Sequence, residues 1–179
     1  MMTGRSILVL DCTQKGEPSE GKLLKQFFSI CRLFKPAKAK AVCYSVRSKS
    51  ELLSKLNTGK RYDIIHISAH GLKEGPRDAT IGNGSTWEVS AEEIDRLDHT
   101  AKLVFLNACV SNTKKMAEAF KSDYFIAPST EVRWDDAALF SLMFYKRYVV
   151  DGVSIKHAFQ FARSHTKTGK DYKSFWYKK

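Results

Sequence analysis

The amino-acid sequence predicts a three-layer α/β/α fold built around a mainly parallel β-sheet. Short apolar runs rich in β-branched residues alternate along the chain with segments whose apolar residues recur at helical spacing. Strands that alternate with helices form parallel sheets, because each helix returns the chain to the edge where the next strand begins. The 179 residues suffice for one packed core and are few for two, so we expect a single domain over residues 1–179.

The first half of the chain contains predicted strands and helices in alternation. Apolar residues recur every three or four positions in the first helix, which Pro36 is expected to end. The second helix is expected to be capped by Ser50. The strands are expected at 6–10, 41–46 and 64–69, and the helices at 22–34 and 50–56.

The second half continues the alternation after a small β-hairpin at 79–89. Gly82, Asn83 and Gly84 predict its turn, since these residues favour hairpin loops. Ser90 followed by Glu93 has the spacing of a capping box at the start of a short helix. Strands are expected at 103–108, 124–127 and 175–177, and helices at 90–97, 116–120, 137–148 and 154–163.

Composition and charge narrow the class of protein. The chain is 43% hydrophobic, and none of its apolar runs approaches the roughly 18 residues that a membrane span needs. Its N-terminal residues lack the features of a signal peptide, so we expect a cytoplasmic protein. Of the net charge of +11, residues 21–50 supply eight Lys or Arg and no acidic residue. This basic stretch is either a solvated surface or a contact for nucleic acid, an anionic membrane or an acidic protein; no nucleic-acid motif accompanies it.

Two chemically useful residues follow neighbouring predicted strands. His70 comes directly after the strand at 64–69, and Cys109 directly after the strand at 103–108. Ligand sites in open α/β sheets lie beyond the carboxyl ends of the strands, so the two side chains would share one rim. An imidazole that takes the thiol proton makes Cys109 a nucleophile, and the N–H groups of Gly71 and Cys109 would stabilise an oxyanion. The alternative is a structural His at a strand end and a buried Cys.

The remaining Cys and His residues favour no metal or cofactor. No C-x-x-C pair is present, and Cys31 and Cys43 are expected to be buried thiols. His66 and His70 have H-x-x-x-H spacing, but Ile67 occupies the position of the metalloprotease Glu and the β-branched run favours a strand. We therefore expect no metal and no cofactor. His66 is expected in the core, His99 in a loop, and His157 and His165 on helix surfaces.

These motifs resemble those of a known family. His70-Gly71 after one apolar strand and Ala108-Cys109 after the next resemble the dyad of caspase-like (clan CD) cysteine peptidases, specifically the CHAT domain group related to separases and caspases. The resemblance covers roughly residues 60–177 and includes the hairpin region, the C-terminal helices and the aromatic end. It implies five parallel strands and an antiparallel sixth, with the dyad on adjacent central strands. It also implies an endopeptidase that forms a thioester through Cys109, with His70 as acid and base.

The sequence departs from the family pattern at two places. Asn112 stands where Gly is usual, and Glu131 stands where Trp is usual, while Asp135 is retained. Because acidic residues in this region of related peptidases accept a basic P1 side chain, the resemblance implies that Asp135, with Glu131 or Asp136, binds Arg or Lys. Asp135 is also placed to cap the helix at 137–148, and the two roles are compatible.

The leading interpretation is a cytoplasmic thiol protease that cleaves a partner protein, in a bacterial antiviral defence or cell-death system by analogy with the family. With no sensor or repeat domains of its own, the chain is expected to need activation by a separate protein or a small signal molecule. Two alternatives remain. One is a catalytically silent caspase-like module that recruits partners through its basic face, and the other is a nucleic-acid-binding protein that uses residues 21–50.

Overall fold

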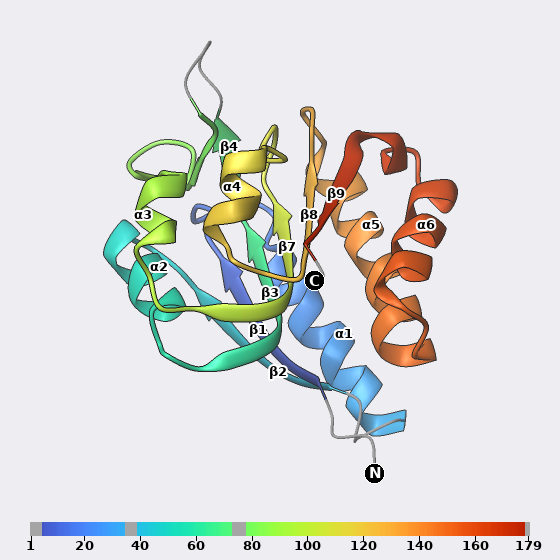
Figure 1. Cartoon of the computed structure of the whole chain (residues 1–179). Helices are drawn as coiled ribbons and strands as arrows, with labels where there is room; N and C mark the ends of the chain where they lie inside the picture. The colour runs from blue at the N-terminus through green and yellow to red at the C-terminus, as the bar shows by residue number, and fades with distance from the viewer. Residues whose placement is uncertain (1–4, 35–38, 73–77, 178–179) are drawn as a thin grey trace.

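One six-stranded sheet runs through the computed structural model, which describes residues 5–34, 39–72 and 78–177 (Figure 1). The strand order is β2-β1-β3-β7-β8-β9. The first five strands are parallel, and β9 pairs antiparallel with β8, which confirms the predicted fold class. The strands are β1 (Arg5–Asp11), β2 (Ala39–Ser45), β3 (Arg61–Ser68), β7 (Thr100–Asn107), β8 (Tyr124–Pro128) and β9 (Tyr172–Trp176).

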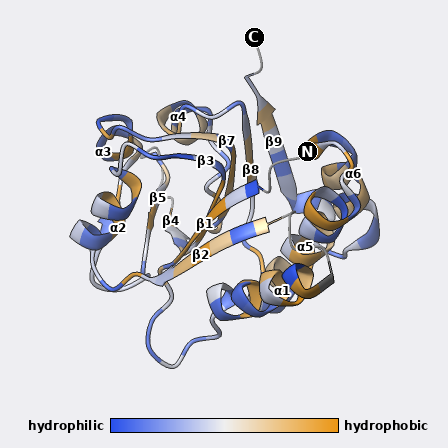
Figure 2. Ribbon diagram, turned by 90° about the horizontal axis from the view of Figure 1, so that it is seen from below, coloured by the Kyte–Doolittle hydropathy of each residue, from blue (hydrophilic) through white to orange (hydrophobic). Residues whose placement is uncertain are grey.

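Helices cover both faces of this sheet, as the view from below shows (Figure 2). One face carries α1 (Glu20–Phe34), α5 (Trp134–Tyr145) and α6 (Ile155–His165), and the other carries α2 (Lys49–Leu56), α3 (Ala91–Asp95) and α4 (Lys114–Ala119). A π-helix, η1 (Lys146–Asp151), continues α5, and a short 3-10 helix, η2 (Gly169–Asp171), precedes β9. Within the described ranges, no helix is both long enough and apolar enough to cross a bilayer.

The core divides into two layers because successive side chains of a strand point to opposite faces of the sheet. In β1, for example, Leu8 and Leu10 pack under α2 to α4, while Ile7 and Val9 pack under α1, α5 and α6. The central strands are buried on both faces, which explains why they are continuous apolar runs in the sequence.

Phe105 of β7 lies at the centre of the second layer. Its side chain is fully buried, and its ring contacts the rings of His66, Phe140, Phe144, Tyr145 and Tyr172. Phe140 in turn stacks on Tyr172, with 3.8 Å between ring centroids. The aromatic cluster thus joins α5 to the first residue of the antiparallel strand β9.

A second, three-stranded sheet follows the strand that leads to His70. It consists of β4 (His70–Leu72), β5 (Thr80–Gly82) and β6 (Glu88–Val89), all antiparallel. The predicted hairpin is present, but its turn extends over residues 83–87, because the Asn83 side chain accepts the N–H groups of residues 85, 86 and 87. The strand β4 was not predicted. Strand β3 ends at Ser68, and His70 is the first residue of a separate strand.

Several helix ends differ from the sequence-based expectation. Ser48 caps α2 through the N–H of Glu51, so the expectation of Ser50 was wrong. The Ser90 capping box is confirmed, with Glu93 bonded back to the Ser90 N–H. Helix α5 begins at Trp134, three residues earlier than expected. The described part of α1 ends at Phe34, and Pro36 lies outside the described residues.

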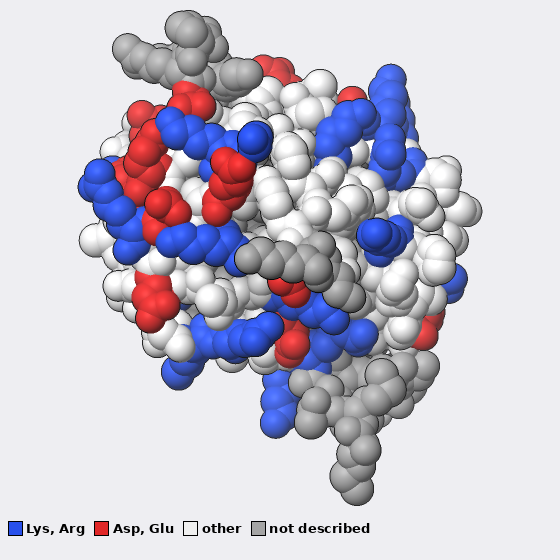
Figure 3. Space-filling view, viewed as in Figure 1, with Lys and Arg blue, Asp and Glu red and all other residues white. Residues whose placement is uncertain are grey.

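The charged side chains are unevenly distributed. Lys22, Lys25 and Arg32 on α1 and Lys40 on β2 are exposed members of the basic stretch, whereas Lys35 and Lys38 lie outside the described residues. Figure 3 shows acidic side chains gathered over α3 and α4 on the opposite part of the molecule.

Phe105→Ala is expected to lower the free energy of unfolding by about 3 to 5 kcal/mol, because it removes a fully buried ring and leaves a cavity among other rings. Urea denaturation measures the change. The matched control is Leu33→Ala on α1, where the side chain is 80% exposed and the expected change is within about 0.5 kcal/mol. Equal effects of the two substitutions would contradict the proposed role of Phe105.

Candidate active site

The backbone brings the segments that carry His70 and Cys109 together at one edge of the sheet. Strands β3 and β7 are neighbours, and Ser68 is in register with Asn107, so each candidate residue lies two positions beyond that pair. Gly71 packs directly on the turn that follows β7: a Cβ at position 71 would lie 1.9 Å from the Cys109 carbonyl oxygen. Only glycine permits this approach, so the sequence His70-Gly71 positions the imidazole segment against the thiol segment.

The Cys109 side chain is half-buried and contacts the loop after β8. Its Sγ accepts the Val132 N–H at 3.4 Å and lies 3.6 Å from the Val132 carbonyl oxygen. Across the described ranges, no hydrogen bond involves the Cys109 N–H, so this donor is available to an incoming oxygen.

The turn after Cys109 is strained. Val110 has φ of 50°, a left-handed conformation that β-branched residues rarely adopt and that costs on the order of 1 to 3 kcal/mol. Two hydrogen bonds join the turn to the segment after β8 and to the end of β8, from the Val110 N–H to the Thr130 carbonyl and from the Asn112 N–H to the Pro128 carbonyl. The left-handed residue of this turn is Val110, two positions before Asn112.

His70 is held by three contacts from different parts of the chain. Its Nε2 lies 3.0 Å from Glu17 Oε1, and its ring meets Trp134 edge-to-face with 5.3 Å between centroids. Gly84 lies against the ring, since a Cβ there would be 2.7 Å from the ring Cγ. Glu17 is itself fixed by the Gln14 N–H at 2.7 Å. A neutral imidazole that donates from Nε2 to Glu17 leaves Nδ1 as a proton acceptor.

The two candidate side chains are not hydrogen-bonded to each other, as far as the described residues show. Sequence reasoning identified His70 and Cys109 but missed Glu17 and Trp134. Glu17 lies in the loop after β1, and that strand is parallel to β3, so its loop reaches the same edge. An acidic residue in that loop was the available signal.

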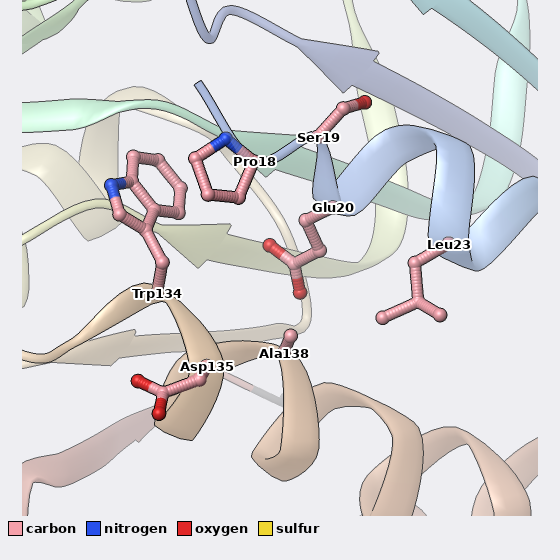
Figure 4. A pocket seen from close by; sticks show the side chains of 7 residues that line it. All are labelled: Pro18, Ser19, Glu20, Leu23, Trp134, Asp135 and Ala138. Carbon is pink, nitrogen blue, oxygen red and sulfur yellow. The ribbon is translucent and has the colours of Figure 1, made fainter. Parts of the chain in front are cut away.

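A cavity of about 300 Å³ adjoins the His70 contacts (Figure 4). Trp134 is one of its walls, and Pro18, next to Glu17, is another. Figure 4 shows the Glu20 carboxylate between Trp134 and Ala138, while the Asp135 carboxylate extends away from Glu20. The cavity is lined by Pro18, Ser19, Glu20, Leu23, Trp134, Asp135 and Ala138.

Glu20 is a buried carboxylate in a hydrogen-bonded network. It accepts the Ser68 hydroxyl at 2.9 Å and the Asn107 amide at 2.8 and 2.9 Å, and His66 Nε2 lies 3.4 Å away. Burial by itself raises the pKa of Glu20, but the charge of His66 and the hydrogen bonds around the carboxylate outweigh burial and lower this pKa to about 2. Glu20 is therefore ionised, but its carboxylate is buried and bonded within the protein.

The structure separates the three acidic residues expected to bind a basic P1 side chain. Glu131 is exposed and does not line the cavity, and Asp136 is half-buried and does not line it either. Asp135 does line the cavity, but Arg133 binds its two carboxylate oxygens at 3.1 and 2.9 Å and thereby lowers its pKa. The expectation that Asp135 caps the helix was wrong, because Arg133 is at the N-cap without a side-chain bond and Asp135 lies in the first turn.

The other histidines and cysteines mostly lie where the sequence predicted. His66 is in the core, His99 is in a loop although buried, and His157 and His165 are exposed on α6. Cys31 is buried, whereas Cys43 is only half-buried, because β2 is an edge strand with one uncovered side.

Comparison with solved structures places the fold among the caspase-like cysteine proteases. Over 98% of its length the chain is similar to the separase of the Saccharomyces cerevisiae separase–securin complex, with a TM-score of 0.61 and 14% identity. It is similar over 97% of its length to a secreted C11 cysteine protease from Bacteroides thetaiotaomicron in complex with an irreversible peptide inhibitor (TM-score 0.60, 9% identity). Over 93% it is similar to the Arg-specific cysteine proteinase gingipain R (TM-score 0.58, 11% identity).

These proteins are longer than the present chain, which spans 12% of the separase chain, 66% of the C11 protease chain and 44% of the gingipain R chain. A comparison of the sequence with family models and with curated proteins gives no match. At these identities the similarity establishes a fold shared with caspase-like cysteine proteases.

Cys109 is expected to react with iodoacetamide before the other cysteines, because it borders the site, while burial raises the pKa of the Cys12, Cys31 and Cys43 thiols. Mass spectrometry of the partly alkylated protein measures the order. His70→Ala is expected to slow Cys109 alkylation by about tenfold or more if the imidazole takes the thiol proton. Alkylation of Cys43 ahead of Cys109 in the unmodified protein would contradict the expectation.

Proposed function

We propose that this chain is a cysteine endopeptidase that cleaves a partner protein after a basic residue, with Cys109 as nucleophile and His70 as acid and base. The close approach of Gly71 to the Cys109 backbone carries the proposal, because it brings the segment that contains His70 against the turn that contains Cys109. The fold shared with caspase-like cysteine proteases supports it.

In the proposed reaction His70 Nδ1 takes the Cys109 thiol proton, and Sγ bonds to the carbonyl carbon of the peptide. The N–H groups of Cys109 and Gly71 hold the oxyanion. The carbon–nitrogen bond breaks as His70 returns the proton to the departing amine, which leaves a thioester. His70 then takes a proton from water, and the resulting hydroxide attacks the thioester, which releases the carboxylic acid and restores the thiol.

Glu17 acts as a positioning residue in this proposal. Its carboxylate accepts the Nε2 proton, so the neutral ring carries its lone pair on Nδ1, and the contact fixes the ring plane. The Trp134 side chain also restrains the His70 ring, through an edge-to-face contact. The side chains of His70 and Glu17 are 31% and 27% exposed, so their contact contributes little to the stability of the protein. Its role is to orient the His70 ring.

A basic P1 side chain fits the cavity beside Trp134. Asp135 lies at its edge with an exposed carboxylate, which is the group that a cationic side chain would meet there. Gingipain R is described as Arg-specific, and its fold is similar. Asp136, one residue further along α5, forms no ion pair with any described residue and remains a second acidic candidate. Exposed Glu131 lies apart from the cavity.

Activation by a partner protein or signal molecule is supported by the contact between Cys109 and Val132. One residue of the loop after β8 contacts the thiol through its backbone, as donor and as acceptor. A partner that shifts this loop would free the sulfur for a substrate. The proposed setting in a bacterial defence or cell-death system rests on the sequence resemblance to the CHAT group.

Peptides that differ only at P1 are expected to be cleaved about tenfold or more faster with Arg or Lys than with Asp, because the Asp135 carboxylate lines the cavity. Steady-state kcat/KM measures the preference. Cys109→Ala is expected to abolish hydrolysis, whereas the control Cys43→Ala on β2 retains it. Preference for Asp at P1 would refute the assignment of the cavity, and brisk turnover by the purified chain alone would remove the case for an activator.

Glu17→Ala is expected to lower kcat by about 100-fold and Glu17→Gln by about tenfold, because the amide still accepts the Nε2 proton. KM is expected to stay within about twofold, since Glu17 does not touch the substrate. Stopped assays give kcat and KM, and urea denaturation checks that stability is unchanged. The matched control is Glu118→Gln on α4, and a drop in stability that accounts for the lost activity would overturn the positioning role.

A further inference from the structure

A second cavity, of about 290 Å³, opens on the small sheet next to His70. Leu72, the last residue of β4, forms one side of it and is 46% exposed. None of its lining residues belongs to the cavity beside Trp134. The cavity is lined by Leu72, Gly82, Gly84, Ser85, Thr86, Trp87 and Glu88.

Residues that line the cavity adjoin His70. His70 and Leu72 are two residues apart on β4, so their side chains lie on the same face of the small sheet. Gly82, a lining residue, pairs with His70 across the sheet. Gly84, another lining residue, has φ of +81°, and a Cβ there would lie 2.7 Å from the His70 Cγ. Gly84 thus leaves room for the ring beside the cavity.

His70 therefore contacts a wall residue of each cavity. Trp134 belongs to the first cavity, which carries the charge suited to a P1 side chain, and Gly84 belongs to the second. In the proposed reaction the imidazole gives its proton to the departing amine nitrogen. The substrate residues that follow the scissile bond are attached to this nitrogen. They must therefore lie on the same side of the reacting carbon as His70, and the second cavity is on that side.

We infer that the second cavity binds the first residues on the leaving-group side of the scissile bond and selects apolar side chains there. The inference rests on the proposed function. Leu72 and Trp87 supply the apolar surface that such a side chain would cover. Glu88 is exposed at the edge, where the Thr80 hydroxyl holds its carboxylate at 2.6 Å. A negative charge fixed there disfavours Asp or Glu in the same part of the substrate.

Quenched fluorescent peptides test this inference. They share Arg at P1 and carry either Leu or Asp at the two following positions. The native chain is expected to cleave the Leu peptide with a kcat/KM about tenfold or more above that of the Asp peptide. Leu72→Ser is expected to reduce this ratio to below about threefold, because it removes the apolar wall. Val42→Ser on β2 is the matched control, since Val42 is 45% exposed and lies outside both cavities.

Binding to the Cys109→Ala variant gives a second measurement that needs no turnover. Fluorescence anisotropy of the same labelled peptides is expected to show about tenfold tighter binding of the Leu peptide, and the added Leu72→Ser substitution is expected to remove the difference. An unchanged ratio in Leu72→Ser, by both measurements, would overturn the inference.

An Arg substrate with a coumarin amide, which has no residue on the leaving side, separates the two proposals. If this substrate is cleaved in a Cys109-dependent manner while Leu and Asp peptides are treated equally, the peptidase stands and the second subsite fails. If no substrate is cleaved but Leu-dependent binding disappears in Leu72→Ser, the subsite stands and the peptidase fails. Absence of both cleavage and binding overturns both.

Discussion

The buried carboxylate of Glu20 is the group on which the arrangement of the candidate site depends. It reaches from the start of α1 to Ser68 at the end of β3 and to Asn107 at the end of β7. These residues lie two positions before His70 and Cys109, respectively. An unpaired buried charge would cost several kcal/mol, and the hydrogen bonds of this network and the contact with His66 offset that cost. One carboxylate thus ties together the strands that carry both candidate catalytic residues.

The main strands of the sheet could be predicted because each is marked by a pattern within its own segment of the sequence. Strands β1, β3 and β7 are continuous apolar runs, and burial on both faces requires such runs. The strand β4 escaped prediction because its pairing with β5 depends on residues further along the chain, and its three residues have no periodicity of their own. The start of α5 was also missed, since no side chain caps it and the sequence signal for a cap is absent.

The candidate site was only half predictable for a related reason. His70 and Cys109 stand out because each follows a strand, and their order along the chain implies a common edge. Glu17 and Trp134 lie in segments that reach the same edge from elsewhere in the chain, and nothing in the sequence pairs them with an imidazole. Asp135 was expected as a cap, but a neighbouring guanidinium two residues earlier takes its carboxylate. At this position the ion pair with Arg133 outweighed the preference of Asp for the N-cap of a helix.

The close fit of Gly71 against Cys109 also changes how genetic data on this chain should be interpreted. A side chain at position 71 would collide with the backbone of the neighbouring turn, so a substitution there disturbs folding before it disturbs chemistry. Loss of activity at position 71 then reports the shape of the main chain and is no evidence for an oxyanion donor. The position would be intolerant even in a protein whose thiol had already been removed, and that intolerance marks it as part of the architecture.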